Sequence, residues 1–81
     1  MRDWSSQRAA RVLAALLRIG WRVRRERGGS HKTLARDGWP DYTWAFHDRV
    51  EIGPVMLKKI GKHTGLTPDD LGRADAGRSP R

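Results

Sequence analysis

The stretch that decides the fold runs from Ala9 to Arg24, with the sequence AARVLAALLRIGWRVR. Its first part carries an apolar stripe at helical spacing: Ala9, Val12, Leu13, Leu16 and Leu17. Gly20 is suited to a left-handed stop, and after it Trp21 to Arg24 alternates apolar and basic residues with the period of a strand. The sequence therefore predicts a helix from about Ser6 to Ile19, capped by Ser5 or Ser6, followed at once by a strand.

Two more strands are expected after this stretch. A turn at residues 27–30 leads into a strand from His31 to Arg36. A longer turn at residues 37–41 leads into a third strand from Tyr42 to His47, where aromatic residues alternate with smaller ones.

The rest of the chain predicts a second helix and a tail. Gly53-Pro54 opens this helix, Gly65 ends it, and residues 66–71 form a short capped helical turn. We expect one domain over residues 1–71 and a flexible tail over residues 72–81. The order helix, three strands, helix predicts an α+β fold, a three-stranded antiparallel sheet with both helices on one face.

Alternation along each strand predicts which side chains the helices cover and which face solvent. The expected buried set is Trp21, Val23, Leu34, Tyr42, Trp44 and Phe46. The expected exposed set is Arg22, Arg24, His31, Thr33, Ala35, Thr43, Ala45 and His47. Such a face is basic and carries little bulk, so it suits a flexible polynucleotide without a deep pocket.

The charge of the chain is uneven. Residues 1–36 hold ten Lys or Arg and two Asp or Glu, whereas residues 37–81 hold seven of each, so the net charge of +8 lies in the first part. A basic block beside a neutral one is typical of a protein that binds a polyanion, although solubility alone explains it equally well. An anionic membrane surface fits less well, because the amphipathic helix is needed for the core.

The composition excludes several classes of protein. A chain of 81 residues buries only about 60% of the surface that its unfolded form exposes, so we expect no large enclosed pocket. The lack of cysteine excludes disulfides and thiolate metal sites and suits a reducing cytoplasm. No apolar run approaches the ~18 residues of a membrane span, and the N-terminus lacks the apolar region of a signal peptide.

Several short segments together resemble one family. They are Leu17-Arg18-Ile19-Gly20-Trp21, Gly29-Ser30-His31, Ile52-Gly53-Pro54, Met56-Leu57-Lys58-Lys59-Ile60 and Thr64-Gly65-Leu66. In this order, over about residues 10–71, they resemble the HicA toxins, also described as YcfA-like. The resemblance implies a fold like that of double-stranded-RNA-binding domains, metal-independent mRNA cleavage that arrests growth, and inhibition by a HicB-type antitoxin. The chain departs from the family at Lys32, where a second histidine is common, and in the turn around Trp39-Pro40, which we expect to be longer than usual.

The resemblance also implies that the essential histidine of the family is His31. RNA cleavage without a metal needs a base for the 2′-OH, an acid for the 5′-oxygen and positive charge near the phosphate. Imidazole suits the first two roles, because its ordinary pKa of about 6.5 keeps both protonation states available near neutrality. The alternative is a solvated turn histidine with no role.

The two other histidines have different expectations. His47 is the candidate second acid or base, because alternation places it on the same face as His31, although it also simply ends the third strand. His63 lies late in the second helix, where a cation complements the helix dipole, and is expected to be structural. The three histidines lack the spacing of zinc ligands, so we expect no metal and no cofactor.

Nine residues are candidates for RNA contact: Arg22, Arg24, Arg25, Arg27, Ser30, Lys32, Lys58, Lys59 and Lys62. The three helix lysines resemble the phosphate-contacting stretch of double-stranded-RNA-binding domains, although a solvated helix face explains them equally well. Trp39, beside Pro40, is the tryptophan expected to be exposed for base stacking. Two further functions remain open, a non-catalytic RNA-binding module of the same fold and a protein-interaction domain for an acidic partner.

Overall fold

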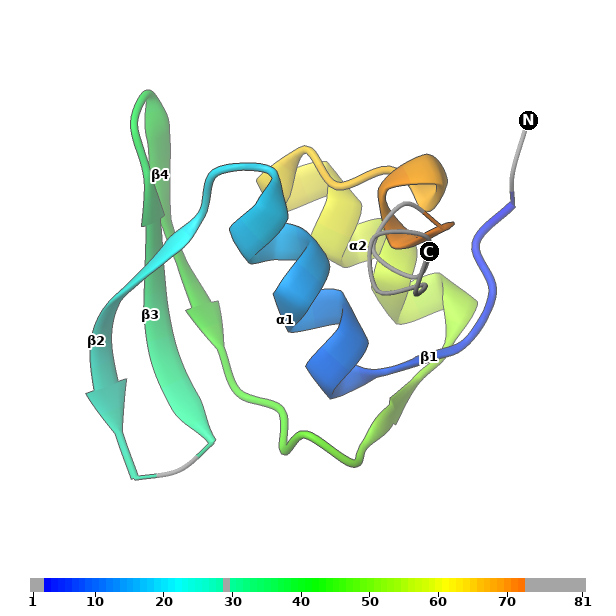
Figure 1. Ribbon diagram of the computed structural model, residues 1–81, viewed down its shortest axis with the longest axis horizontal. Coiled ribbons are helices and arrows are strands. Elements are labelled where there is room, and N and C mark those ends of the chain that lie inside the picture. Colours follow the sequence, from blue (N-terminus) through cyan, green and yellow to red (C-terminus); the bar gives the residue numbers. More distant parts are fainter. Residues whose placement is uncertain (1–2, 29, 73–81) are drawn as a thin grey trace, which may run out of the picture.

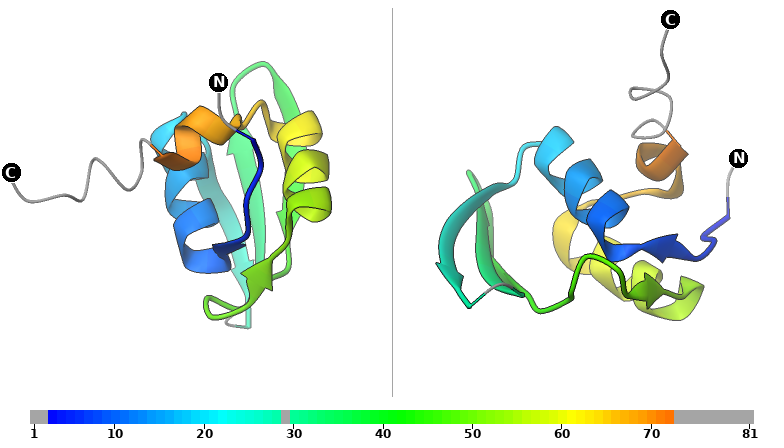
Figure 2. Two further views of the ribbon diagram at one scale, coloured as in Figure 1. Left: turned by 90° about the vertical axis from the view of Figure 1, so that its right-hand side faces the viewer. Right: turned by 60° about the horizontal axis from the view of Figure 1, so that its bottom comes forward.

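The computed structural model of the protein describes residues 3–28 and 30–72. Its elements are β1 (Gln7–Arg8), α1 (Ala9–Arg18), β2 (Arg22–Arg27), β3 (His31–Arg36), β4 (Trp39–Trp44), β5 (Glu51–Ile52) and α2 (Pro54–Thr64). Strands β2, β3 and β4 form an antiparallel sheet in that order. Helices α1 and α2 both lie on one face of this sheet (Figure 1, Figure 2). The predicted α+β fold is confirmed.

Helix α1 begins three residues later than expected. Gln7 and Arg8 form β1, which pairs antiparallel with β5 and adds a small two-stranded sheet that the sequence did not predict. The N–H groups of Ala9 and Ala10 then donate to the carbonyl oxygens of Val50 and Asp48, at 2.7 and 3.1 Å. No side chain caps the helix, so the expected serine cap is wrong. Backbone groups from a distant loop satisfy the first helical donors in its place.

Strand β4 covers residues 39–44 and not the predicted residues 42–47. Asp37-Gly38 forms a two-residue turn in which Gly38 adopts a φ of 84°, and Asp-Gly is a favoured dipeptide for such hairpins. The expected long turn is therefore wrong, and the chain re-enters the sheet at Trp39. Pro40 is tolerated inside the strand because β4 lies at an edge of the sheet.

The core lies between the sheet and the two helices. Leu16 of α1, Leu34 of β3, Trp44 of β4 and Leu57 and Ile60 of α2 are fully buried. The end of α2 is fixed by polar contacts as well. There the Trp21 indole N–H donates to the carbonyl oxygen of Thr64 at 3.0 Å, and the Thr64 hydroxyl donates to the carbonyl oxygen of Ile60 at 2.6 Å.

Two irregularities interrupt the predicted alternation. The β2–β3 register shifts between Val23 and Arg25, and the β3–β4 register shifts between Leu34 and Arg36. Each shift adds one residue on one strand, and such a bulge re-aims the neighbouring side chains. Accordingly Val23, expected inside, is 39% exposed, and Ala35, expected outside, is only 6% exposed. Tyr42 and Phe46 are partly buried and pack against the core.

The C-terminal part of the described chain adds to the core. Residues 68–72 are helical, and Leu71 is buried with the other core residues. Gly72 is therefore part of a helical turn, and residues 73–81 of the expected tail lie outside the described residues. None of the helices within residues 3–28 and 30–72 is long and apolar enough to span a bilayer.

Candidate functional site

The sheet has one face that the helices leave uncovered, and the central strand β3 sets its geometry (Figure 2). Leu34 points to the helices and is fully buried, so His31 and Thr33 point the opposite way. Arg27 lies opposite His31 in the β2–β3 ladder. Arg25 and Thr43 lie opposite Thr33 on the two flanking strands. We call the surface formed by Arg25, Arg27, His31, Thr33 and Thr43 the outer face.

His31 lies at one end of the outer face, where β3 begins. Its side chain is exposed, and it helps to line a shallow pocket of about 290 Å³. The pocket is lined by Arg25, Arg27, His31, Lys32, Thr33 and Thr43. The structure thus brings one histidine, two arginines and two threonines to the lining of one small depression.

The arginines of β2 differ in their partners. Arg24 Nη1 lies 2.6 Å from Asp41 Oδ2, and Arg22 Nη1 lies 3.6 Å from Asp37 Oδ1. Within residues 3–28 and 30–72, Arg25 and Arg27 form no ion pair. Their charge is therefore available to a bound anion, whereas the charge of Arg22 and Arg24 is partly compensated.

A second depression of about 250 Å³ adjoins the first and is lined by Arg24, Arg25, Thr33 and Asp41. The bulge in β2 is the reason for its shape, because it brings two consecutive arginines, Arg24 and Arg25, to the same side of the strand. Asp41 was not among the residues expected at the site, because residues 37–41 were expected to form a turn. The Asp-Gly dipeptide at residues 37–38 was the signal that would have extended the strand to include it.

Lys32 and Ser30 lie differently from the arginines. Lys32 belongs to the helix-covered side of β3, opposite Trp44. Its side chain is only 14% exposed, and its Nζ lies 3.7 Å from Glu26 Oε2. Lys32 nevertheless helps to line the pocket around His31. Ser30 is partly buried in the turn before β3.

The two other histidines lie apart from the pocket around His31. Strand β4 ends at Trp44, so His47 lies in the following loop, where its carbonyl oxygen accepts the N–H of Val50 at 3.0 Å. Alternation along the strand therefore no longer places His47 on the same face as His31. His63 Nδ1 lies 2.9 Å from the carbonyl oxygen of Lys59, and its ring stacks on Tyr42 at 6.2 Å. Burial raises the pKa of the Tyr42 phenol above its ordinary value.

The lysines of α2 form a separate basic surface. Lys58, Lys59 and Lys62 are all exposed, whereas Leu57 and Ile60 on the same helix are buried in the core. Because α2 covers the opposite face of the sheet (Figure 2), these lysines do not line the pocket around His31. The predicted RNA-contacting residues thus fall on two surfaces.

Trp39 is exposed, as expected, at 38%, but its ring also makes contacts within the protein. Its ring makes an edge-to-face contact with Trp21 at 6.0 Å, and the guanidinium carbon of Arg36 lies 5.3 Å from its centre. Gly65 adjoins the same ring, since a Cβ at that position would lie 2.9 Å from it. These contacts tie Trp39 to the end of α2.

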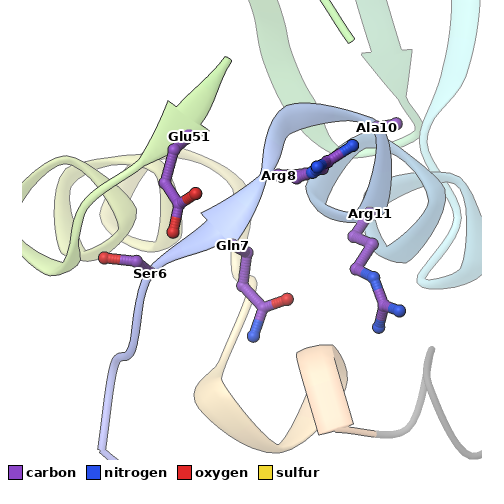
Figure 3. A pocket seen from close by; sticks show the side chains of 6 residues that line it. All are labelled: Ser6, Gln7, Arg8, Ala10, Arg11 and Glu51. Atoms are coloured by element: carbon purple, nitrogen blue, oxygen red, sulfur yellow. The ribbon is translucent and has the colours of Figure 1, made fainter. Parts of the chain in front are cut away.

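A separate depression lies elsewhere, where β1 leads into α1 (Figure 3). Its volume is about 460 Å³, and it is lined by Ser6, Gln7, Arg8, Ala10, Arg11 and Glu51. None of the candidate residues from the sequence lines it. Across residues 3–28 and 30–72, no three His, Cys, Asp or Glu side chains are grouped as ligands for a metal ion.

Comparison with known proteins places the chain beside one described family. A family model described as the HicA toxin of bacterial toxin–antitoxin systems matches residues 9–66, which extend from the start of α1 to just beyond α2. No curated protein and no solved structure matches the chain.

Proposed function

The chain belongs to the HicA toxin family of bacterial toxin–antitoxin systems, and from this premise we propose that it is a metal-independent endoribonuclease that cleaves mRNA with His31 as catalytic acid and base. Cleavage of mRNA inhibits translation and growth. The observation that supports the proposal is the position of His31, exposed in a small pocket beside Arg25 and Arg27.

The proposed reaction uses the 2′-OH of the RNA as its nucleophile. Neutral His31 accepts the 2′-hydroxyl proton while the 2′-oxygen attacks the adjacent phosphorus. The bond from phosphorus to the 5′-oxygen breaks, and the imidazolium returns a proton to that oxygen. The products are a 2′,3′-cyclic phosphate and a 5′-hydroxyl, so atoms and charge balance without a metal or a second reactant.

Arg25 and Arg27 supply the electrostatic part of the proposal. The phosphate gains negative charge as the 2′-oxygen attacks, and fixed cations beside it lower the barrier. Neither guanidinium is engaged in an ion pair with another described residue, so both charges act on the phosphate. A shallow pocket at the protein surface suits single-stranded RNA, because a single strand bends to meet it.

We further propose that the partner is a HicB-type antitoxin and that the toxin acts in the cytoplasm, where its mRNA substrate is found. Membership of a toxin–antitoxin family supports a partner of this kind. Co-expression with the product of a neighbouring reading frame is expected to abolish growth arrest. Persistent arrest with every neighbouring product would contradict the assignment of the partner.

The test of the proposed activity is His31→Ala. We expect growth arrest and RNA cleavage to disappear, while affinity for single-stranded RNA changes little, because the arginines remain. His63→Gln is the matched control, since His63 lies on α2, away from the pocket, and should keep full activity. If wild-type protein binds RNA but never cleaves it, the chain is a non-catalytic RNA-binding module.

A further inference from the structure

One ion pair crosses the outer face from edge to edge. Arg24 belongs to β2 and Asp41 to β4, and β3 lies between these strands. Because neighbouring strands lie about 4.8 Å apart, the Arg24 side chain must cross β3 to bring Nη1 within 2.6 Å of Asp41 Oδ2. The bulge in β2 directs it across the outer face.

This pair closes the depression next to the His31 pocket. The two depressions share Arg25 and Thr33 as their common wall. Along β3 the step from His31 to Thr33 is two residues, or about 6.8 Å, which is comparable to one nucleotide of an extended RNA strand. If the phosphodiester that is cleaved lies at His31, the neighbouring nucleotide of the same RNA therefore lies at Arg24 and Asp41.

The chemistry of the second depression differs from that of the first. Asp41 places a carboxylate on an otherwise basic face, and this group repels a phosphate. An exposed ion pair contributes little to stability, and both side chains remain substantially exposed, at 62% and 43%. The second depression is therefore better suited to a base than to the RNA backbone.

The pair also matches particular bases. A carboxylate only accepts hydrogen bonds, whereas a guanidinium only donates them. Guanine presents two adjacent donors, N1–H and the 2-amino group, beside the acceptor O6, which complements Asp41 and Arg24 together. Uracil presents a carbonyl oxygen on each side of its single N–H, and these oxygens repel the carboxylate.

We propose that Asp41, held in place by Arg24 across the outer face, is a specificity-determining residue that favours an amino-bearing base, guanine above all, beside the cleaved link. This inference rests on the proposed function, because the cleaved link defines the position of the base. Carboxylate and guanidinium recognition of a base edge discriminates by about fivefold or more.

The test uses short single-stranded RNAs that differ only at the positions flanking the cut, with guanine, adenine, cytosine, uracil or inosine. The wild type is expected to cleave the guanine RNA at least about fivefold faster than the uracil RNA. Inosine lacks the 2-amino group and should lose part of that advantage. Asp41→Asn should remove the preference, whereas Asp37→Asn, which alters the similar Arg22–Asp37 pair at the hairpin end, should retain it. An unchanged base pattern in Asp41→Asn overturns the proposal, even if all rates rise together.

Binding of the same RNAs to His31→Ala separates this proposal from the proposed catalysis. If the wild type does not cleave RNA but Asp41 still determines which RNA binds, the catalytic proposal fails and base selection stands. If cleavage occurs without dependence on Asp41, base selection fails and the proposed function stands. Absence of any RNA binding overturns both.

Discussion

Removing the positive charge of Arg25 and Arg27 together should flatten the salt dependence of RNA binding. Each cation that neutralises a phosphate of single-stranded RNA contributes about 0.7 to the slope of log K against log salt. Neither residue is paired with an acid among the described residues, so we count one phosphate for each. The Arg25→Ala/Arg27→Ala variant should therefore have a slope smaller by about 1.4.

This difference is large enough to measure. Between about 50 and 200 mM salt, the wild type should lose about sevenfold more affinity than the double variant. Fluorescence polarisation of a labelled single-stranded RNA measures both, in a His31→Ala background so that the RNA stays intact. Arg22→Ala is the matched control, because Arg22 lies beside Asp37 and should change the slope much less. An identical slope in the wild type and the double variant would refute the assignment of the outer face as the phosphate-binding surface.

Two further predictions concern stability. Burial raises the folded-state pKa of Tyr42 above 10.0. The contribution of the protonated phenol to the free energy of unfolding is therefore complete below pH about 10, and it is lost as the pH rises through that higher pKa. Chemical unfolding at pH about 8 and about 11 should show a smaller alkaline loss of stability in Tyr42→Phe than in the wild type, and an equal loss would contradict the role of burial. Gly65→Ala should lower the free energy of unfolding by at least about 1–2 kcal/mol, because Gly65 has a φ of 80° and a Cβ there meets the Trp39 ring. Gly38→Ala shares the positive φ but has open space around it, so thermal unfolding should show a smaller loss, and equal losses would exclude the contact with Trp39 as a cause.

The general architecture was accessible from sequence because strong local signals agree with it. The change from helical to strand period at Gly20 predicted β2 directly after α1, and Gly53-Pro54 predicted the start of α2. His31 was expected at the start of a strand and exposed to solvent, and it lies there. Each of these features is set by a few adjacent residues, so tertiary contacts did not override it.

The errors arose where contacts between distant segments decide the structure. Helix α1 begins at Ala9 because backbone oxygens of residues 48 and 50 accept its first N–H groups, and no local cap signal reports such a partner. The bulges beside Val23 and Ala35 depend on strand register, which alternation along one strand cannot indicate.

One local signal does predict the true start of β4, and it has the largest effect on the candidate site. The Asp37-Gly38 dipeptide forms a two-residue turn, which moves β4 three residues earlier in the chain. This shift removes His47 from the sheet and brings Asp41 onto the outer face. Asp41 therefore lines a depression beside the His31 pocket, and His47 is not among the residues that line either one.

The most direct test of the central claim is the chemical nature of the RNA ends, determined by mass spectrometry after incubation with a metal chelator. We expect a 2′,3′-cyclic phosphate and a 5′-hydroxyl with the wild type, and intact RNA with His31→Ala. A 5′-phosphate product, or cleavage that persists without the imidazole, would contradict this claim.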